Sequence, residues 1–119
     1  MNTFLATRVA AILGFLAVGL GAFGAHSLKP MLIQNHMLEV WEKAVFYQFI
    51  HTVMLYYLGR RTPVPSGPWL FFFAGIVLFS GSLYVLALSG VRWLGFITPF
   101  GGVSFLIGWF CLAIRGDKD

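Results

Sequence analysis

The sequence predicts an all-α integral membrane protein: an antiparallel four-helix transmembrane bundle with a short interfacial helix between spans one and two. Of the 119 residues, 59% are hydrophobic and 10% are charged, whereas soluble domains carry about 25% charged residues. The mean hydropathy is +0.84. Charged side chains also divide the chain into four apolar runs, and a spanning helix needs about 17 to 25 mostly apolar residues. We therefore predict a single transmembrane domain, residues 1–119, that faces lipid.

The four apolar runs set the bounds of the predicted spans. These are residues 5–25, 41–59, 69–88 and 93–114. The first run has no clear basic n-region and no good A-x-A site after it, so we expect a span rather than a cleaved signal peptide. Aromatic residues near the span ends are expected at the membrane interfaces: Trp41, Trp69, Trp93 and Tyr84.

The segment 30–42, PMLIQNHMLEVWE, is too polar to cross a membrane. Pro30 suits the first turn of a helix, and Glu39 and Lys43 form a favourable i,i+4 pair. We predict a short helix that lies at the interface and runs into the second span. An irregular loop is the alternative.

Lysine and arginine counts predict the orientation, because cytoplasmic loops carry the excess of basic residues. The side of both termini holds five: Arg8, Arg60, Arg61, Arg115 and Lys118. The other side holds three: Lys29, Lys43 and Arg92. Both termini are therefore predicted to be cytoplasmic. Basic residues that stand singly between apolar runs argue against nucleic-acid binding, so the predicted partner is the lipid bilayer.

Small residues at i,i+3 or i,i+4 spacing predict close helix packing in two spans. We name them the first stripe, made of Gly14, Ala17, Gly21 and Gly24, and the second stripe, made of Gly101, Gly102 and Gly108. One stripe is expected to pack within the chain and the other between copies in a homo-oligomer. Other membrane proteins are further candidate partners. Pro99 is expected to kink the start of the fourth span.

Polar side chains within the predicted spans form the candidate site. Tyr47, Gln48 and His51 occupy adjoining parts of one helical surface, and unpaired polar groups are costly in hydrocarbon. We predict that all three face the interior and that His51 bonds to a polar group of another helix. The candidate partners are Ser80, Ser82, Tyr84, Thr98 and a carbonyl freed by Pro99. His26, which closes the first span, completes the candidate set.

The sequence offers little support for catalysis or for a metal site. His26, His36 and His51 are ten and fifteen residues apart, which matches no compact zinc motif. All four acidic residues lie near predicted membrane edges or in the tail, so no paired carboxylates fall within the spans. We predict no catalytic residue, no metal and no cofactor. The lone cysteine, Cys111, is expected to be a packing residue.

Four ordered motifs resemble a known family. They are GAFGAHSLKP at 21–30, W-x2-A-x2-YQ-x2-H at 41–51, FSGSLY-x-LALSG at 79–90 and ITPFGG-x-SFLIGW at 97–109. With them the chain resembles, over nearly its whole length, the domain-of-unknown-function family 423. The resemblance implies a small four-span protein of the bacterial plasma (inner) membrane. It implies no activity, because the family is uncharacterised.

Two functional hypotheses stay open. The first is a small, non-enzymatic structural or accessory membrane protein that packs through its small-residue stripes. The second is a small channel or carrier whose route is lined by His51 and its polar neighbours. The first is preferred, because transporters usually show repeats or helices broken near the midplane. Here the one break signal, Thr98-Pro99, lies near a span end.

Overall fold

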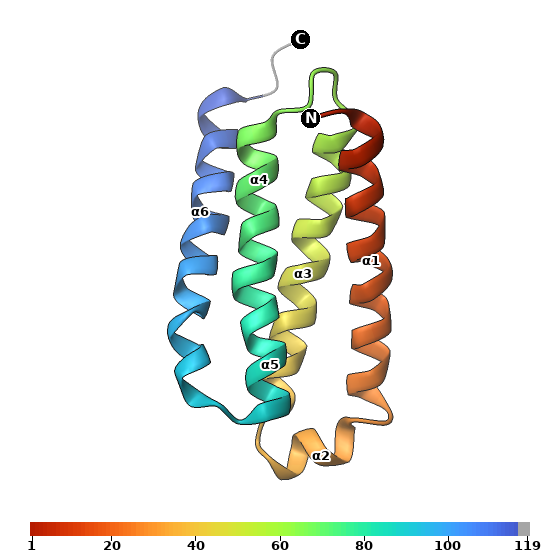
Figure 1. Cartoon of the computed structure of the whole chain (residues 1–119), viewed down its shortest axis with the longest axis vertical. Coiled ribbons are helices and arrows are strands. Elements are labelled where there is room, and N and C mark those ends of the chain that lie inside the picture. The colour runs from red at the N-terminus through yellow and green to blue at the C-terminus, as the bar shows by residue number, and fades with distance from the viewer. Residues whose placement is uncertain (117–119) are drawn as a thin grey trace.

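The computed structural model describes residues 1–116, and all its regular elements are helical. In chain order they are α1 (Thr3–Ala25), α2 (Lys29–Gln34), α3 (Leu38–Gly59), α4 (Ser66–Gly75), the π-helix η1 (Ile76–Gly81), α5 (Ser82–Ser89), the 3₁₀-helix η2 (Arg92–Phe96) and α6 (Thr98–Arg115). Because α4, η1 and α5 are continuous, they form one long rod. Figure 1 shows this rod side by side with α1, α3 and α6, and α2 at the end opposite the chain termini. The predicted all-α class is confirmed for this part of the chain.

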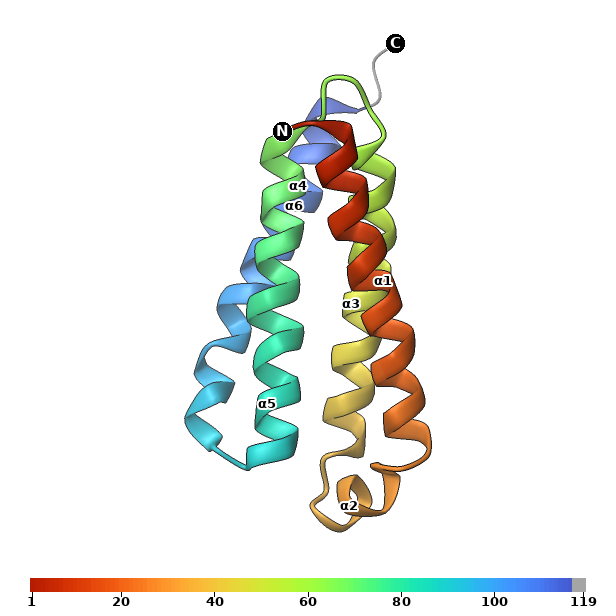
Figure 2. The ribbon, with the colours of Figure 1, turned by 45° about the vertical axis from the view of Figure 1, so that its right-hand side comes forward.

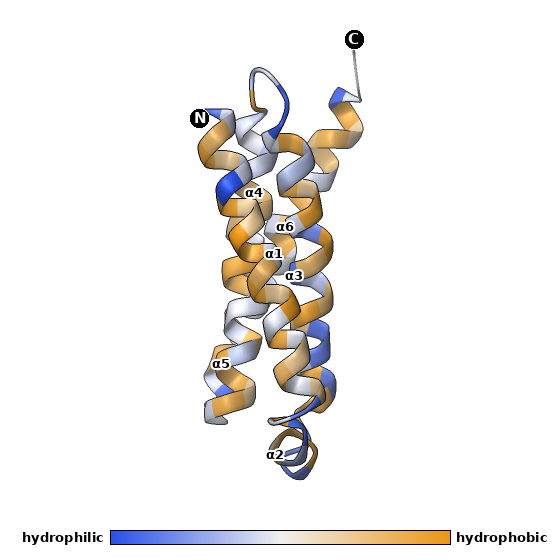
Figure 3. Cartoon of the chain, turned by 90° about the vertical axis from the view of Figure 1, so that its right-hand side faces the viewer, coloured by the Kyte–Doolittle hydropathy of each residue, from blue (hydrophilic) through white to orange (hydrophobic). Residues whose placement is uncertain are grey.

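Three helical stretches are long and apolar enough to cross a membrane: Thr3–Ala25, Ser66–Ser89 and Arg92–Arg115. Helix α3 has 22 residues, but charged residues occupy its first turns and polar residues occupy its inner face. Figure 3 shows hydrophobic residues along the long helices. Hydrophilic residues are gathered in the loop between α3 and α4, in α2 and early in α3. Lys118, which entered the orientation prediction, lies outside the described residues.

The helices associate mainly as two pairs. Helix α1 packs along α3, and α6 packs along α4 and η1. Figure 2 shows that the two pairs separate toward the end that carries α2 and α5. Near the opposite end a hydrophobic core joins the pairs, and it includes Ala6, Leu58, Trp69 and Phe72. The packing is therefore closest near the termini and more open near α2.

Both small-residue stripes pack inside the chain. A Cβ at Gly24 would overlap the Trp41 indole, and one at Gly101 would overlap the backbone of Phe79. The first stripe thus meets α3, and the second meets η1 and α4. The expectation that one stripe is left for a second copy is wrong, because neighbouring helices of the same chain already fill both. The homo-oligomer itself stays a prediction, and its interface would have to lie elsewhere.

The segment predicted as one helix over 30–42 is divided. Helix α2 ends at Gln34 and α3 begins at Leu38. Between them His36 has a φ of 57°, a left-handed conformation that does not continue an α-helix. Pro30 does lie in the first turn of α2, where a missing N–H costs no helical hydrogen bond.

Pro99 lies in the first turn of α6, directly after the 3₁₀-helix η2, so the fourth predicted span changes from 3₁₀- to α-helix next to the proline. The expectation for two of the interfacial aromatic residues needs correction. Trp41 and Trp69 are buried rather than interfacial. Their indole N–H groups donate to the carbonyls of Leu20 and Leu55, at 2.8 and 3.2 Å. In contrast, Trp93 is 60% exposed.

Adjacent glycines provide a test of the packing between α6 and η1. We predict that Gly101→Ala lowers the free energy of unfolding by about 1–3 kcal/mol, because the added methyl overlaps the Phe79 backbone, which cannot rotate away. Gly102→Ala is the matched control, since its Cβ would lie 3.9 Å from the nearest Phe79 atom. Thermal unfolding in detergent measures both. Equal stabilities of the two variants would contradict this packing.

Candidate functional site

Gln48 joins three helices. Its Nε2 donates to the Leu13 carbonyl of α1 at 2.9 Å, and its Oε1 accepts from the Tyr84 hydroxyl of α5 at 2.5 Å. The side chain is only 3% exposed. Because an amide both donates and accepts, this one residue of α3 links the α1–α3 pair to the other half of the molecule.

His51, one turn further along α3, is 4% exposed. The indole Nε1–H of Trp109 on α6 donates to His51 Nε2 at 2.9 Å, and His51 Nδ1 lies 2.7 Å from the Tyr47 carbonyl. An indole N–H can only donate and a carbonyl can only accept. These partners therefore define the neutral tautomer of His51 with the proton on Nδ1.

Aromatic rings surround the imidazole. The Phe105 ring stacks on it with centroids 3.6 Å apart and planes 11° apart, and the Phe72 centroid is 5.4 Å away. The inter-helix partner is Trp109, which was not among the predicted partners. Trp109 ends the ITPFGG-x-SFLIGW motif, so the motif did contain a hydrogen-bond donor for His51. Because the residues around Trp109 are apolar, the sequence alone gave no reason to separate this indole from the rest of the apolar run.

Three hydroxyl groups hold the π-helix region in place. Ser80 donates to the Ala44 carbonyl of α3 at 2.7 Å. Ser82 lies 2.6 Å from the Thr98 hydroxyl and donates to the Phe79 carbonyl at 3.0 Å. These bonds tie η1 and α5 to α3 and to the start of α6. π-Helical turns occur frequently at functional sites.

Other predicted or polar residues stand apart from this network. His26 is exposed at the end of α1, so the structure does not bring it to His51. The side chain of Tyr47 is 37% exposed and does not face fully inward as predicted. The sequence analysis missed Ser104, which donates to the Phe71 carbonyl at 2.6 Å. Thr52 has a buried hydroxyl without a partner among residues 1–116.

Two hollows lie along α3 where it faces η1 and α6, with the Tyr47 and Phe79 rings, whose centroids are 4.7 Å apart, between them. We call the two hollows together the α3–α6 groove. Its inner part, about 430 Å³, is lined by Tyr47, His51, Phe79, Val103, Leu106 and Trp109, among others. Its outer part, about 450 Å³, is lined by Glu39, Lys43, Tyr47, Phe79, Leu83 and Thr98, among others. Tyr47 and Phe79 belong to both parts. The inner part is almost entirely apolar, whereas the outer part carries two charged groups.

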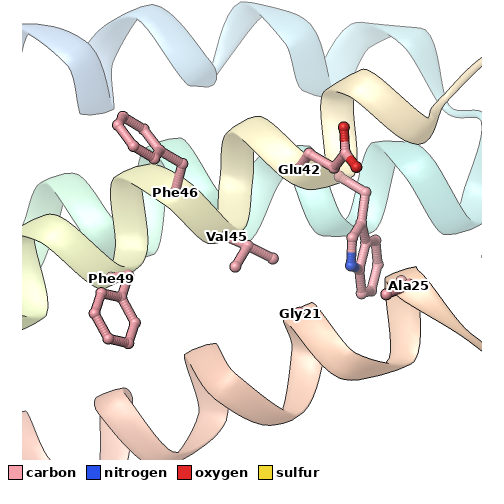
Figure 4. Close-up of a pocket in the computed structure, with 8 residues that line it drawn as sticks. Gly21, Ala25, Glu42, Val45, Phe46 and Phe49 are labelled. Carbon is pink, nitrogen blue, oxygen red and sulfur yellow. The ribbon is translucent and has the colours of Figure 1, made fainter.

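A second hollow, of about 460 Å³, lies between α1 and α3. Figure 4 shows Val45 and Phe49 directed from α3 toward α1, with the Glu42 carboxylate on the side away from Gly21. The N–H of Trp41, which also lines this hollow, is already bonded to Leu20. No polar groups converge here, so we interpret the hollow as space left beside the first stripe. Within residues 1–116, no three His, Cys, Asp or Glu residues are grouped to hold a metal ion.

The bond between Trp109 and His51 generates a prediction. Trp109→Phe keeps an aromatic ring but removes the donor to Nε2, so we expect the free energy of unfolding to fall by about 0.6 and at most about 1.7 kcal/mol. Trp93→Phe, at an exposed indole, is the control and should change stability less. In ¹⁵N NMR spectra of the unmodified chain, the His51 Nδ1 should carry the proton. A protonated Nε2 would rule out the assigned hydrogen bond.

Comparisons with known proteins agree with the apolar, membrane-protein character of the chain. A family model described as "Protein of unknown function (DUF423)" matches residues 20–102. A UPF0382 membrane protein of Staphylococcus epidermidis is 50% identical over 113 residues, which cover 91% of each chain. The UPF0382 membrane protein YwdK of Bacillus subtilis is 44% identical over 115 residues, 91% of this chain and 92% of the relative. No solved structure matches. The chain therefore belongs to the family of unknown function DUF423, and its relatives are named membrane proteins.

Proposed function

We propose that this protein is a non-enzymatic, accessory protein of the bacterial plasma membrane, folded as a four-span bundle whose buried polar residues hold its helices together. The environment of His51 carries this proposal. Both ring nitrogens have partners, an indole N–H and a backbone carbonyl, and Phe105 covers one ring face. A histidine that acts as a general acid or base lies within hydrogen-bond reach of the group with which it exchanges a proton, directly or through a water, whereas the partners of His51 are an indole N–H and a backbone carbonyl, neither of which exchanges protons readily. The His51 imidazole instead makes bonds that stabilise the protein.

The surface of α3 supports its assignment as a membrane span, the second in chain order and additional to the three apolar stretches named above. Its outward side chains are apolar and well exposed, with Phe46 at 60% and Val53 at 55%, while Gln48 and His51 point inward. Polar groups inside and apolar groups outside are the arrangement that a bilayer favours. Residues 44–59 of α3 carry no charged side chain and extend about 24 Å, somewhat less than a hydrocarbon core of about 30 Å. The charged first turns of α3 would then lie at the depth of the headgroups.

The charged residues support the proposed orientation. The end of the molecule that holds the N-terminus also holds the loop between α3 and α4 and the end of α6 (Figure 1). The basic residues of these segments are Arg8 near the start of α1, Arg60 and Arg61 after α3, and Arg115 at the end of α6. The opposite end holds Lys29, Lys43 and Arg92. An excess of basic residues on the terminal side favours cytoplasmic termini. Helix α2 would then lie at the external interface, with Leu32 buried against the rest of the protein.

The alternative, a small channel or carrier, has one observation in its favour: His51 lines the α3–α6 groove. That groove lies on the outside of the helices and its inner part is apolar. Apart from Thr52, whose hydroxyl has no partner among residues 1–116, the buried polar side chains that were described above bond to one another or to carbonyls. This arrangement does not provide a chain of sites for a solute. We therefore keep transport as the second hypothesis.

The four-span topology predicts where fused reporters lie. A fluorescent reporter, active only in the cytoplasm, should be active after residue 63 and after residue 119, and inactive after residue 35 and after residue 90. Secreted alkaline phosphatase at the same positions should give the reverse pattern. If α3 did not cross the membrane, residues 35 and 63 would lie on the same side and the C-terminus would be external. That pattern would overturn the four-span proposal.

A transport assay separates the two functions. We expect purified full-length protein in liposomes to pass a panel of ions and small solutes no faster than empty liposomes. His51→Leu should lower the free energy of unfolding by about 0.6–2 kcal/mol, because it removes one inter-helix bond, and should leave the fluxes unchanged. A flux that depends on the protein and is abolished by His51→Ala, with the fold intact, would favour the channel or carrier.

A further inference from the structure

Four side chains of α3 follow the α3–α6 groove from its outer to its inner part. They are Glu39, Lys43, Tyr47 and His51, spaced four residues apart along one inclined row of the helix. From Lys43 to His51 the row extends about 12 Å along the axis. Charged groups thus stand at one end of the groove, and aromatic groups stand along the rest of it.

The geometry points to a site for one zwitterionic phospholipid, which carries a phosphate and an amine in its headgroup. In this proposal one acyl chain lies in the inner part of the groove and the headgroup lies at Glu39 and Lys43. The inference goes beyond the proposed accessory function, but it rests on the proposed position of α3 within the bilayer.

Charge complementarity at the outer part identifies the headgroup. The Lys43 ammonium and the Glu39 carboxylate line the same hollow. The i,i+4 ion pair expected from their spacing is not formed within residues 1–116, so that expectation was wrong and both charges face the hollow. A lipid phosphate would bind Lys43, and the lipid amine would bind Glu39, through charge-assisted hydrogen bonds. An anionic lipid that lacks the amine would place its negative charge next to the Glu39 carboxylate, and this repulsion disfavours binding of that lipid. Both residues lie in the first two turns of α3, at the depth of a headgroup.

The inner part of the groove suits an acyl chain. Its walls include Phe79, Val103, Leu106 and the half-exposed Trp109, and they present little polar surface. Its volume of about 430 Å³ is that of a small-molecule site, whereas a helix of another protein is about 10 Å wide. An extended hydrocarbon chain therefore fits this space better than a second protein does.

Native mass spectrometry of the delipidated full-length protein tests the site. The probes are phosphatidylethanolamine and phosphatidylglycerol with identical acyl chains. We expect one phosphatidylethanolamine per chain, bound about fivefold or more in preference to phosphatidylglycerol. Val103→Trp should weaken this binding about tenfold by filling the groove, and Val18→Trp, at an exposed position on α1, should not weaken it.

Headgroup variants test the charges. Glu39→Gln should abolish the preference between the two lipids, and its control Glu42→Gln, which lines the other hollow, should preserve it. Lys43→Gln should weaken the binding of both lipids severalfold, and its control Lys29→Gln should not. Glu39, Lys43 and both control residues are exposed, so these variants should fold even where Val103→Trp does not.

Three results would overturn the proposal. These are equal binding of the two lipids to the unmodified chain, lipid binding that Val103→Trp and Glu39→Gln leave unchanged, or a lipid-free dimer that Val103→Trp dissociates. The last result would assign the groove to a second copy of the chain. If the reporter fusions still gave four spans, the lipid site would be wrong and the proposed function would stand. If the reporter fusions instead gave three spans, both the lipid site and the proposed function would lose their basis.

Discussion

The Gln48 amide and the His51 imidazole of α3 are paired within the protein, and this pairing constrains where the other helices lie, although the buried Thr52 hydroxyl has no partner among residues 1–116. Hydrocarbon offers no hydrogen-bond partner, so Gln48 and His51 take theirs from three other helices: the Leu13 carbonyl of α1, the Tyr84 hydroxyl of α5 and the Trp109 indole of α6. With this face turned inward, α3 presents phenylalanine and valine side chains outward. Its sequence therefore has a moderate hydropathy, although its exposed side chains between Phe46 and Val53 are mainly apolar.

Hydrogen bonds between helices require the backbones to come close, and small residues make that approach possible. Gly24 admits the Trp41 indole, and Gly101 brings α6 against the Phe79 backbone. Phe79 lies within the π-helix η1, where Ser80 and Ser82 bond in different directions, to α3 and to Thr98. The widened turn and the glycine contact thus occur at the same place. Close packing and polar pairing therefore depend on each other.

The same arrangement leaves the α3–α6 groove open. Helix α6 packs along α4 and η1, and its contacts with α3 include the stacking of Phe105 on His51 and the Trp109 bond. Toward α2 the two helix pairs separate (Figure 2), so Glu39 and Lys43 face a hollow rather than a neighbouring helix. The groove is thus an outcome of how the pairs diverge, and the charges at its outer part give it chemical specificity.

The sequence by itself determined the all-α class, the four long helical segments within a few residues, and the inward position of Gln48 and His51. These depend on the lengths of the apolar runs between charged residues and on the cost of exposing polar groups to lipid. Only the tertiary structure decided that Trp109, 58 residues away, is the partner of His51, that both small-residue stripes are filled within the chain, and that Glu39, Lys43, Tyr47 and His51 line one groove. The physical reason is that spacing along one helix shows which residues share a face. It does not show which distant helix meets that face, because an indole within an apolar run has the same pattern whether it faces lipid or a buried histidine.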